Sequence, residues 1–143
     1  MDATTPEPNL IRRLAEVLDP REEILEAYLF GSHARGLAQP HSDVDVAVYI
    51  DYARADDTGF GYRANLTTDL IAGLGCNDVD VVVLNRAPPL LYHRVLRDGV
   101  RLLARDLCAT TTREGRAVSR YCDFVPQLEK MEAARRSAAA RGP

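Results

Sequence analysis

Cysteine is scarce in this sequence and follows no ligand or disulfide pattern. Among 143 residues there are three cysteines, Cys76, Cys108 and Cys122, which are odd in number and widely spaced. No Cys-x-x-Cys pair occurs, so the sequence indicates neither a disulfide framework nor a zinc site. Reduced thiols of this kind are typical of an intracellular protein, and we expect a cytoplasmic location.

Long apolar runs and an excess of basic charge are also missing. No stretch approaches the ~20 apolar residues that a membrane span needs, and residues 1–10 lack the basic start and apolar core of a signal peptide. The 18 basic residues are outnumbered by 21 acidic ones, which gives a formal net charge of −3. We therefore expect no membrane association and no direct binding of a long nucleic acid. ATP stays possible, because metal ions can neutralise a triphosphate.

The length fits one domain, since a chain of about 150 residues can bury roughly two thirds of its unfolded surface. No internal repeat is present. We divide the chain into a disordered lead-in (1–8), one domain that includes a C-terminal helix (9–132) and a flexible basic tail (133–143). The apolar helical positions from Val118 to Met131 exceed what one sheet face needs, so this stripe either packs on its own domain or binds a partner.

Hydrophobic patterning predicts strands and helices that alternate along the chain. The predicted strands are 24–30, 44–50, 79–84 and 100–104. The predicted helices run from a cap at Asn9 to Pro20, over 62–74, from Pro88 to Gly99 and from Thr112 onward, the last with a kink near Pro126. This order predicts a small α/β or α+β fold around a mixed sheet of about four strands.

Two carboxylates open the second predicted strand. Asp43 and Asp45 are two residues apart, so their side chains lie on one face of the strand with Cα atoms about 7 Å apart. Hard divalent ions such as Mg²⁺ bind oxygen ligands and usually sit on one or two carboxylates plus substrate phosphates. The pair therefore predicts half of a magnesium site.

The turn after the first predicted strand contains Gly31 and Ser32. Glycine lets the backbone approach a ligand closely, and the serine hydroxyl with the turn amides can hydrogen-bond phosphate oxygens. Arg35 in the following loop could pair with a phosphate, or it could brace the turn through Asp43 or a carbonyl. The histidines, His33, His41 and His93, are interpreted as surface residues without a chemical role.

A third carboxylate is expected from Asp80, which leads into a nearly continuous apolar strand. An ionised aspartate there needs a partner or a metal, because burying a lone charge is costly. If this strand lies beside the Asp43/Asp45 strand, Asp80 completes a cluster of three metal ligands. Asp78, one alternation earlier, is the alternative for that place.

The spacing of these motifs resembles the signature of the DNA polymerase β-type nucleotidyltransferase superfamily. Residues 30–36 (FGSHARG), 42–46 (SDVDV) and 80–91 (DVVVLNRAPPLL) are similar to its small MNT-type branch, and the resemblance covers about residues 28–106. Val83 stands where that branch often has an acidic residue. The resemblance implies a nucleotidyltransferase fold and an antitoxin that transfers AMP to a tyrosine of a HEPN-domain ribonuclease toxin, with which it would form a hetero-oligomer.

The expected reaction uses ATP and two Mg²⁺ ions held by Asp43, Asp45 and Asp80. Asp80 would accept the proton of the acceptor hydroxyl, and Ser32 with the Gly31 turn would hold the outgoing phosphates. Two alternatives stay open. The protein could be a small-molecule nucleotidyltransferase of the aminoglycoside type, or an idle antitoxin that works only by covering its toxin.

Overall fold

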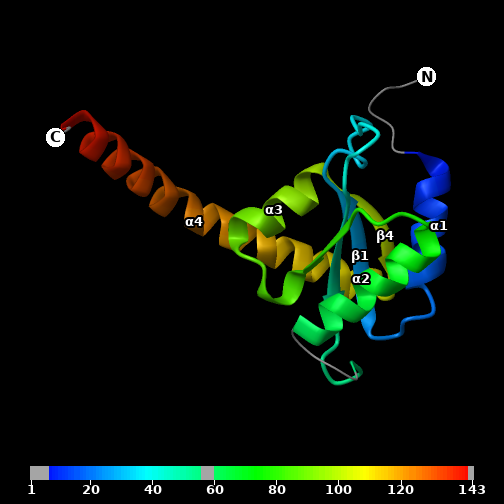
Figure 1. Ribbon diagram of the computed structural model, residues 1–143. Helices are drawn as coiled ribbons and strands as arrows, with labels where there is room; N and C mark the ends of the chain where they lie inside the picture. The colour runs from blue at the N-terminus through cyan, green and yellow to red at the C-terminus, as the bar shows by residue number, and fades with distance from the viewer. Residues whose placement is uncertain (1–6, 56–59, 142–143) are drawn as a thin grey trace.

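The computed structural model describes residues 7–55 and 60–141 and is built on one mixed four-stranded sheet (Figure 1). The strands are β1 (Ile24–Phe30), β2 (Val44–Ile50), β3 (Val79–Val83) and β4 (Val100–Ala104). Their order across the sheet is β3-β2-β1-β4. The β1 strand pairs antiparallel with β2 and β4, whereas β2 and β3 are parallel. The predicted fold class is confirmed, and each strand agrees with its prediction to within one residue.

Helices cover both faces of the sheet. The elements are α1 (Pro8–Leu18), α2 (Phe60–Leu74), the 3₁₀ turn η1 (Leu84–Arg86), α3 (Pro89–Asp98) and α4 (Leu107–Arg141). Alternation along β2 sends Val46 and Val48 into a core with α1 and α2, and Ala47 into a second core with α3 and α4. Asp45 precedes Ala47 by two residues and so lies on the face that α3 and α4 cover.

Several helix ends differ from the sequence prediction. The α1 helix begins at Pro8 rather than being capped by Asn9, since proline suits the first helical position. The α4 helix begins at Leu107 rather than near Thr112, because the Asp106 carboxylate accepts a hydrogen bond from the Ala109 amide at 3.2 Å. Of the predicted lead-in, residues 1–6 lie outside the described residues.

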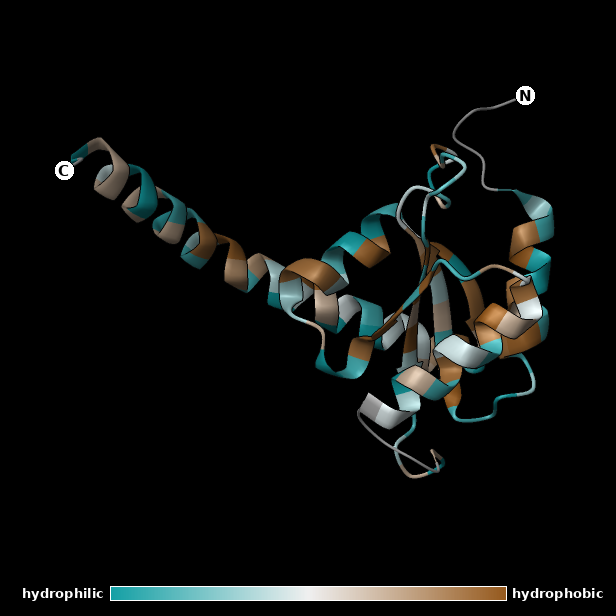
Figure 2. Cartoon of the chain, viewed as in Figure 1, coloured by the Kyte–Doolittle hydropathy of each residue, from teal (hydrophilic) through white to brown (hydrophobic). Residues whose placement is uncertain are grey.

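The α4 helix also continues to Arg141, through the segment for which a flexible tail was expected, with Pro126 inside it. Alanine and arginine, which dominate this segment, have high helix propensities. At 1.5 Å per residue its 35 residues span about 52 Å. The C-terminal half projects away from the sheet (Figure 1), and its hydrophobic residues are interspersed with hydrophilic ones (Figure 2). Despite this length, no helix within residues 7–55 and 60–141 is apolar enough to cross a membrane.

Candidate active site

The parallel pairing of β2 with β3 brings two of the predicted carboxylates together. Asp45 is the register partner of Asp80, as Val44 is of Val79. Register partners on adjacent strands lie on the same face about 4.8 Å apart. Asp43 stands one residue before β2 and is exposed, whereas Asp45 and Asp80 are half-buried. Asp78 is also exposed and precedes β3, so the register places Asp80, not Asp78, beside Asp45.

The turn after β1 lies against Asp45. Gly31 has a φ of 76°, in the left-handed region, and a Cβ at this position would overlap Oδ2 of Asp45. The turn is closed by backbone hydrogen bonds, in which the Leu37 amide donates to the Ser32 carbonyl at 2.9 Å and the Arg35 amide donates to the Gly31 carbonyl at 3.3 Å. Only glycine lets the chain pass this close to the carboxylate.

Electrostatics also link the three aspartates. The pKa of Asp45 is raised above its ordinary value, first by burial and then by the negative charges of Asp80 and Asp43. The nearby His33 opposes this shift and lowers the same pKa. The Asp45 carboxylate therefore lies in a field where a bound cation would relieve repulsion.

Asp80 is held by an arginine in this conformation. Arg63 of α2 donates from Nη2 to Oδ1 of Asp80 at 2.9 Å, and both side chains are about half exposed. Over the described part of the chain, no three carboxylate, imidazole or thiolate side chains converge as a ready metal site. The donor set still fits a hard divalent cation, because the three carboxylates are near enough to act on one another electrostatically and such ions prefer carboxylate oxygen ligands.

Sequence reasoning missed Arg63 and the role of His33. Arg63 comes from a helix whose packing beside β3 cannot be inferred from local sequence. The His33 Nε2 lies 3.2 Å from the Ser42 carbonyl and ties the two halves of the motif together. Arg35 is exposed, and within the described residues its side chain forms no ion pair or hydrogen bond, so the structure does not bring it to the carboxylates.

Comparison with solved structures identifies similar folds. A chain of the complex described as tri-AMPylated Shewanella oneidensis HEPN toxin with MNT antitoxin is 23% identical, with a TM-score of 0.68 over 88% of this chain and 95% of that one. A toxin-antitoxin structure with AMP-PNP gives 23% identity and a TM-score of 0.61, over 92% and 96% of the two chains. A minimal nucleotidyltransferase is 31% identical, with a TM-score of 0.52 over 70% and 95%.

No curated protein matches the sequence. The family model of polymerase β nucleotidyltransferases, by contrast, matches residues 12–107. This range contains the Gly31 turn, the paired strands β2 and β3 and all three aspartates of the site. Because the match covers more than half of the chain, this protein belongs to the polymerase β nucleotidyltransferase family.

Proposed function

We propose that this protein transfers AMP from ATP to a tyrosine hydroxyl of a HEPN-domain toxin and acts as the antitoxin of that toxin. The observation that carries the proposal is the register of β2 and β3, which sets Asp45 beside Asp80 on one sheet face beneath the Gly31 turn. Two carboxylates on neighbouring strands with a third just before them suit metal-dependent phosphoryl chemistry.

Asp43, Asp45 and Asp80 would hold up to two Mg²⁺ ions. When bound, these ions supply neutralisation of the phosphate oxygens and of the charge that develops on the leaving group. The amides of the Gly31 turn and the Ser32 hydroxyl would bind the outer phosphates, since successive turn N–H groups form anion-binding concavities. Arg63, released from Asp80, would carry a free positive charge at the edge of the same site.

The transfer step balances without a further reactant. The tyrosine oxygen forms a bond to the α-phosphorus of ATP, and the bond from that phosphorus to the β-phosphate bridging oxygen breaks, so pyrophosphate leaves. The phenolic proton passes to the Asp80 carboxylate. A tyrosine hydroxyl has an unperturbed pKa near 10, so it needs such a base at neutral pH. The products are an AMP ester of tyrosine and pyrophosphate.

A protein acceptor is supported by what the chain contains besides the site. Apart from the sheet and its covering helices, the main additional feature is the projecting half of α4, where Met131 is 54% exposed. Tyr121 still packs on α3, with its ring stacked on His93 at 3.6 Å. Beyond it the half-buried Val125 and Leu128 extend an apolar stripe along the helix. Such a stripe suits a folded protein partner better than a small molecule, and one similar structure is described as an AMPylated toxin with its antitoxin.

The test combines this protein with ATP, Mg²⁺ and the helical protein encoded beside it, recognised by an Arg-x(4–6)-His ribonuclease motif. Intact-mass measurement should show AMP added to the partner, and peptide mapping should place it on tyrosine. Asp43→Asn with Asp45→Asn should abolish the mass change. The matched control, Glu16→Gln with Glu22→Gln, removes two exposed carboxylates elsewhere on the surface and should leave the transfer intact.

The two alternatives give different results. If the partner is silenced by the Asp43/Asp45 double variant without any mass change, the protein is an idle binding antitoxin. If AMP is transferred to an aminoglycoside but never to protein, it is a small-molecule enzyme. A double variant of Leu128→Ser and Met131→Ser should weaken complex formation while preserving ATP binding, because it alters only the stripe on α4.

A further inference from the structure

A small basic pocket lies away from the aspartate site. It has a cavity volume of about 70 Å³ and lies between the C-terminal end of β2, the η1 turn and α4. Its polar lining comes from Tyr49, Asn85, Tyr92, Arg113, Arg116 and Arg120. Tyr49 and Asp45 share a face of β2 but are four residues apart, which is about 13 Å along the strand. The pocket is therefore separate from the three carboxylates.

Three arginines approach this pocket from one face of α4. Arg113, Arg116 and Arg120 follow the three- and four-residue spacing that aligns side chains along a helix. Arg116 and Arg120 are exposed, and among the described side chains neither forms an ion pair. Among the described side chains, neither of the two nearby carboxylates is paired with Arg116 or Arg120. Glu114 is bonded to Tyr28 and Arg101, and Asp123 is exposed one turn further along α4.

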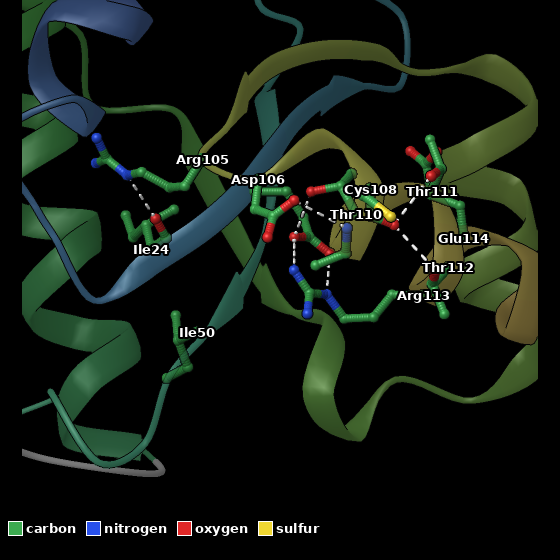
Figure 3. A network of polar contacts seen from close by, with 12 residues as sticks. Ile24, Ile50, Arg105, Asp106, Cys108, Thr110, Thr111, Thr112, Arg113 and Glu114 are labelled. Atoms are coloured by element: carbon green, nitrogen blue, oxygen red, sulfur yellow. Dashed lines mark hydrogen bonds and ion pairs between the residues drawn. The ribbon is translucent and has the colours of Figure 1, made fainter.

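Arg113 forms the fixed wall of the pocket. Its Nε donates to Oε2 of the fully buried Glu26 at 2.7 Å, and its Nη2 donates to Oε1. The Thr110 hydroxyl also donates to Oε1, at 2.9 Å, and Figure 3 shows Thr110 and Arg113 directed into this network. The Arg113 guanidinium lies over the Tyr49 ring, 4.8 Å from its centroid. Because the charge of Arg113 is neutralised by Glu26, the net positive charge of the pocket comes from Arg116 and Arg120.

Tyr92 provides an independent observation that points to a ligand. The residue is only 4% exposed, yet its hydroxyl has no hydrogen-bond partner among the described residues. Buried hydroxyls are nearly always hydrogen-bonded. Burial raises the pKa of Tyr92 to about 12, so the group remains a donor at neutral pH. Tyr92 lines the pocket, so a small rotation of its ring would bring this unused donor, which solvent does not reach in this conformation, against a bound oxygen atom.

We propose that this pocket binds one phosphate group. The guanidinium groups of Arg116 and Arg120 come from α4 and the Tyr92 phenol comes from α3, and guanidinium groups bind phosphate oxygens through charge-assisted hydrogen bonds. A cavity needs about 10–15 Å³ to hold one water molecule. A volume of about 70 Å³ therefore has room for a group of several heavy atoms but not for a whole nucleotide. The source of the group is either inorganic phosphate or the phosphate of a mononucleotide whose base stays outside. Phosphate binding at this pocket does not depend on the proposed AMP transfer.

The experiment titrates the full chain by calorimetry with inorganic phosphate, and separately with AMP, at low ionic strength with EDTA present so that no metal site contributes. Arg116→Gln with Arg120→Gln should weaken phosphate binding at least tenfold. Tyr92→Phe should weaken it severalfold without unfolding the protein, because it removes only an unpaired hydroxyl. The matched control is Arg135→Gln with Arg136→Gln, which removes the same charge from the exposed distal part of α4 and should leave affinity unchanged.

The outcomes separate clearly. Equal affinity for phosphate and AMP identifies inorganic phosphate as a sufficient ligand, whereas tighter binding of AMP that the Arg116/Arg120 variant also loses identifies a mononucleotide, and both results support the pocket. Binding of phosphate and AMP that the Arg116/Arg120 variant retains would belong to another site and would overturn the proposal. Loss of binding in the Arg135/Arg136 control to the same degree would show general attraction to a basic helix and would overturn the proposal. So would the absence of measurable phosphate binding to the unaltered protein at millimolar concentration.

Discussion

Replacing Gly31 by alanine should show how much folding stability depends on the close approach of this turn to Asp45. Gly31 has a φ of 76°, and a Cβ there would overlap the carboxylate of Asp45. Two costs are therefore expected, one from the left-handed backbone and one from displacement of Asp45. Gly75, at the C-terminal end of α2, separates them because it has a φ of 71° and a Cβ added there would meet nothing within 4 Å beyond its chain neighbours.

The stability cost of each alanine substitution follows from the surroundings of the two glycines. A residue with a Cβ costs about 1–2 kcal/mol in the left-handed region, and this cost applies to both glycines. Pushing the Asp45 side chain away from its preferred rotamer adds about 0.5–1.5 kcal/mol at position 31 alone. We expect Gly75→Ala to lower the free energy of unfolding by about 1 kcal/mol. Gly31→Ala should lower it by about 2–3 kcal/mol, a drop in Tm of about 4–10 °C for a domain of this size.

Urea denaturation measures the free energy of unfolding of both alanine variants. Each substitution is then measured again in an Asp45→Ala background. Removing the Asp45 carboxylate eliminates the overlap, so the cost of Gly31→Ala should fall to that of Gly75→Ala, while the cost of Gly75→Ala stays the same. If Gly31→Ala and Gly75→Ala are equally destabilising with Asp45 intact, the close approach of turn and carboxylate is not a constraint and the reasoning fails.

Three further predictions concern the charges of the fold. The pKa of Asp45 is raised in the folded state, so ionisation of this carboxyl destabilises the fold. The free energy of unfolding is therefore highest while Asp45 is protonated, and it falls as the pH rises through the raised pKa. Asp45→Asn should therefore raise Tm at pH 7 and give no gain at about pH 3, and an equal gain at both values would contradict this. Asp80→Ala should eliminate nucleotidyl transfer with a modest loss of ATP binding, whereas Asp78→Ala should be mild; single-turnover kinetics would reveal the reverse if Asp78 were the essential residue. Glu26→Ala should lower the free energy of unfolding in urea by about 3 kcal/mol, because it leaves Arg113 without its buried partner, and a loss below ~1 kcal/mol would refute that role.

Local sequence determined most of the secondary structure and singled out the three aspartates that this fold brings near one another. The alternation of apolar residues from Val44 to Ile50 fixes which side chains share a face, because successive residues of a strand point in opposite directions. For the same reason Asp43 and Asp45 could be paired without coordinates. Gly31 and Gly75 were both recognisable as positions that end an element, and both have positive φ values.

Tertiary structure decided what depends on residues far apart in the chain. The choice of Asp80 over Asp78 as the neighbour of Asp45 required the strand register, which is set by packing across the whole sheet. Arg63 reaches Asp80, and Arg113 reaches Glu26 across 87 positions of sequence, only because helices dock on particular faces. The basic pocket beside Tyr92 likewise exists only where α4 crosses the end of β2. Periodicity reports which face of an element is buried, but it contains no information about the partner that buries it.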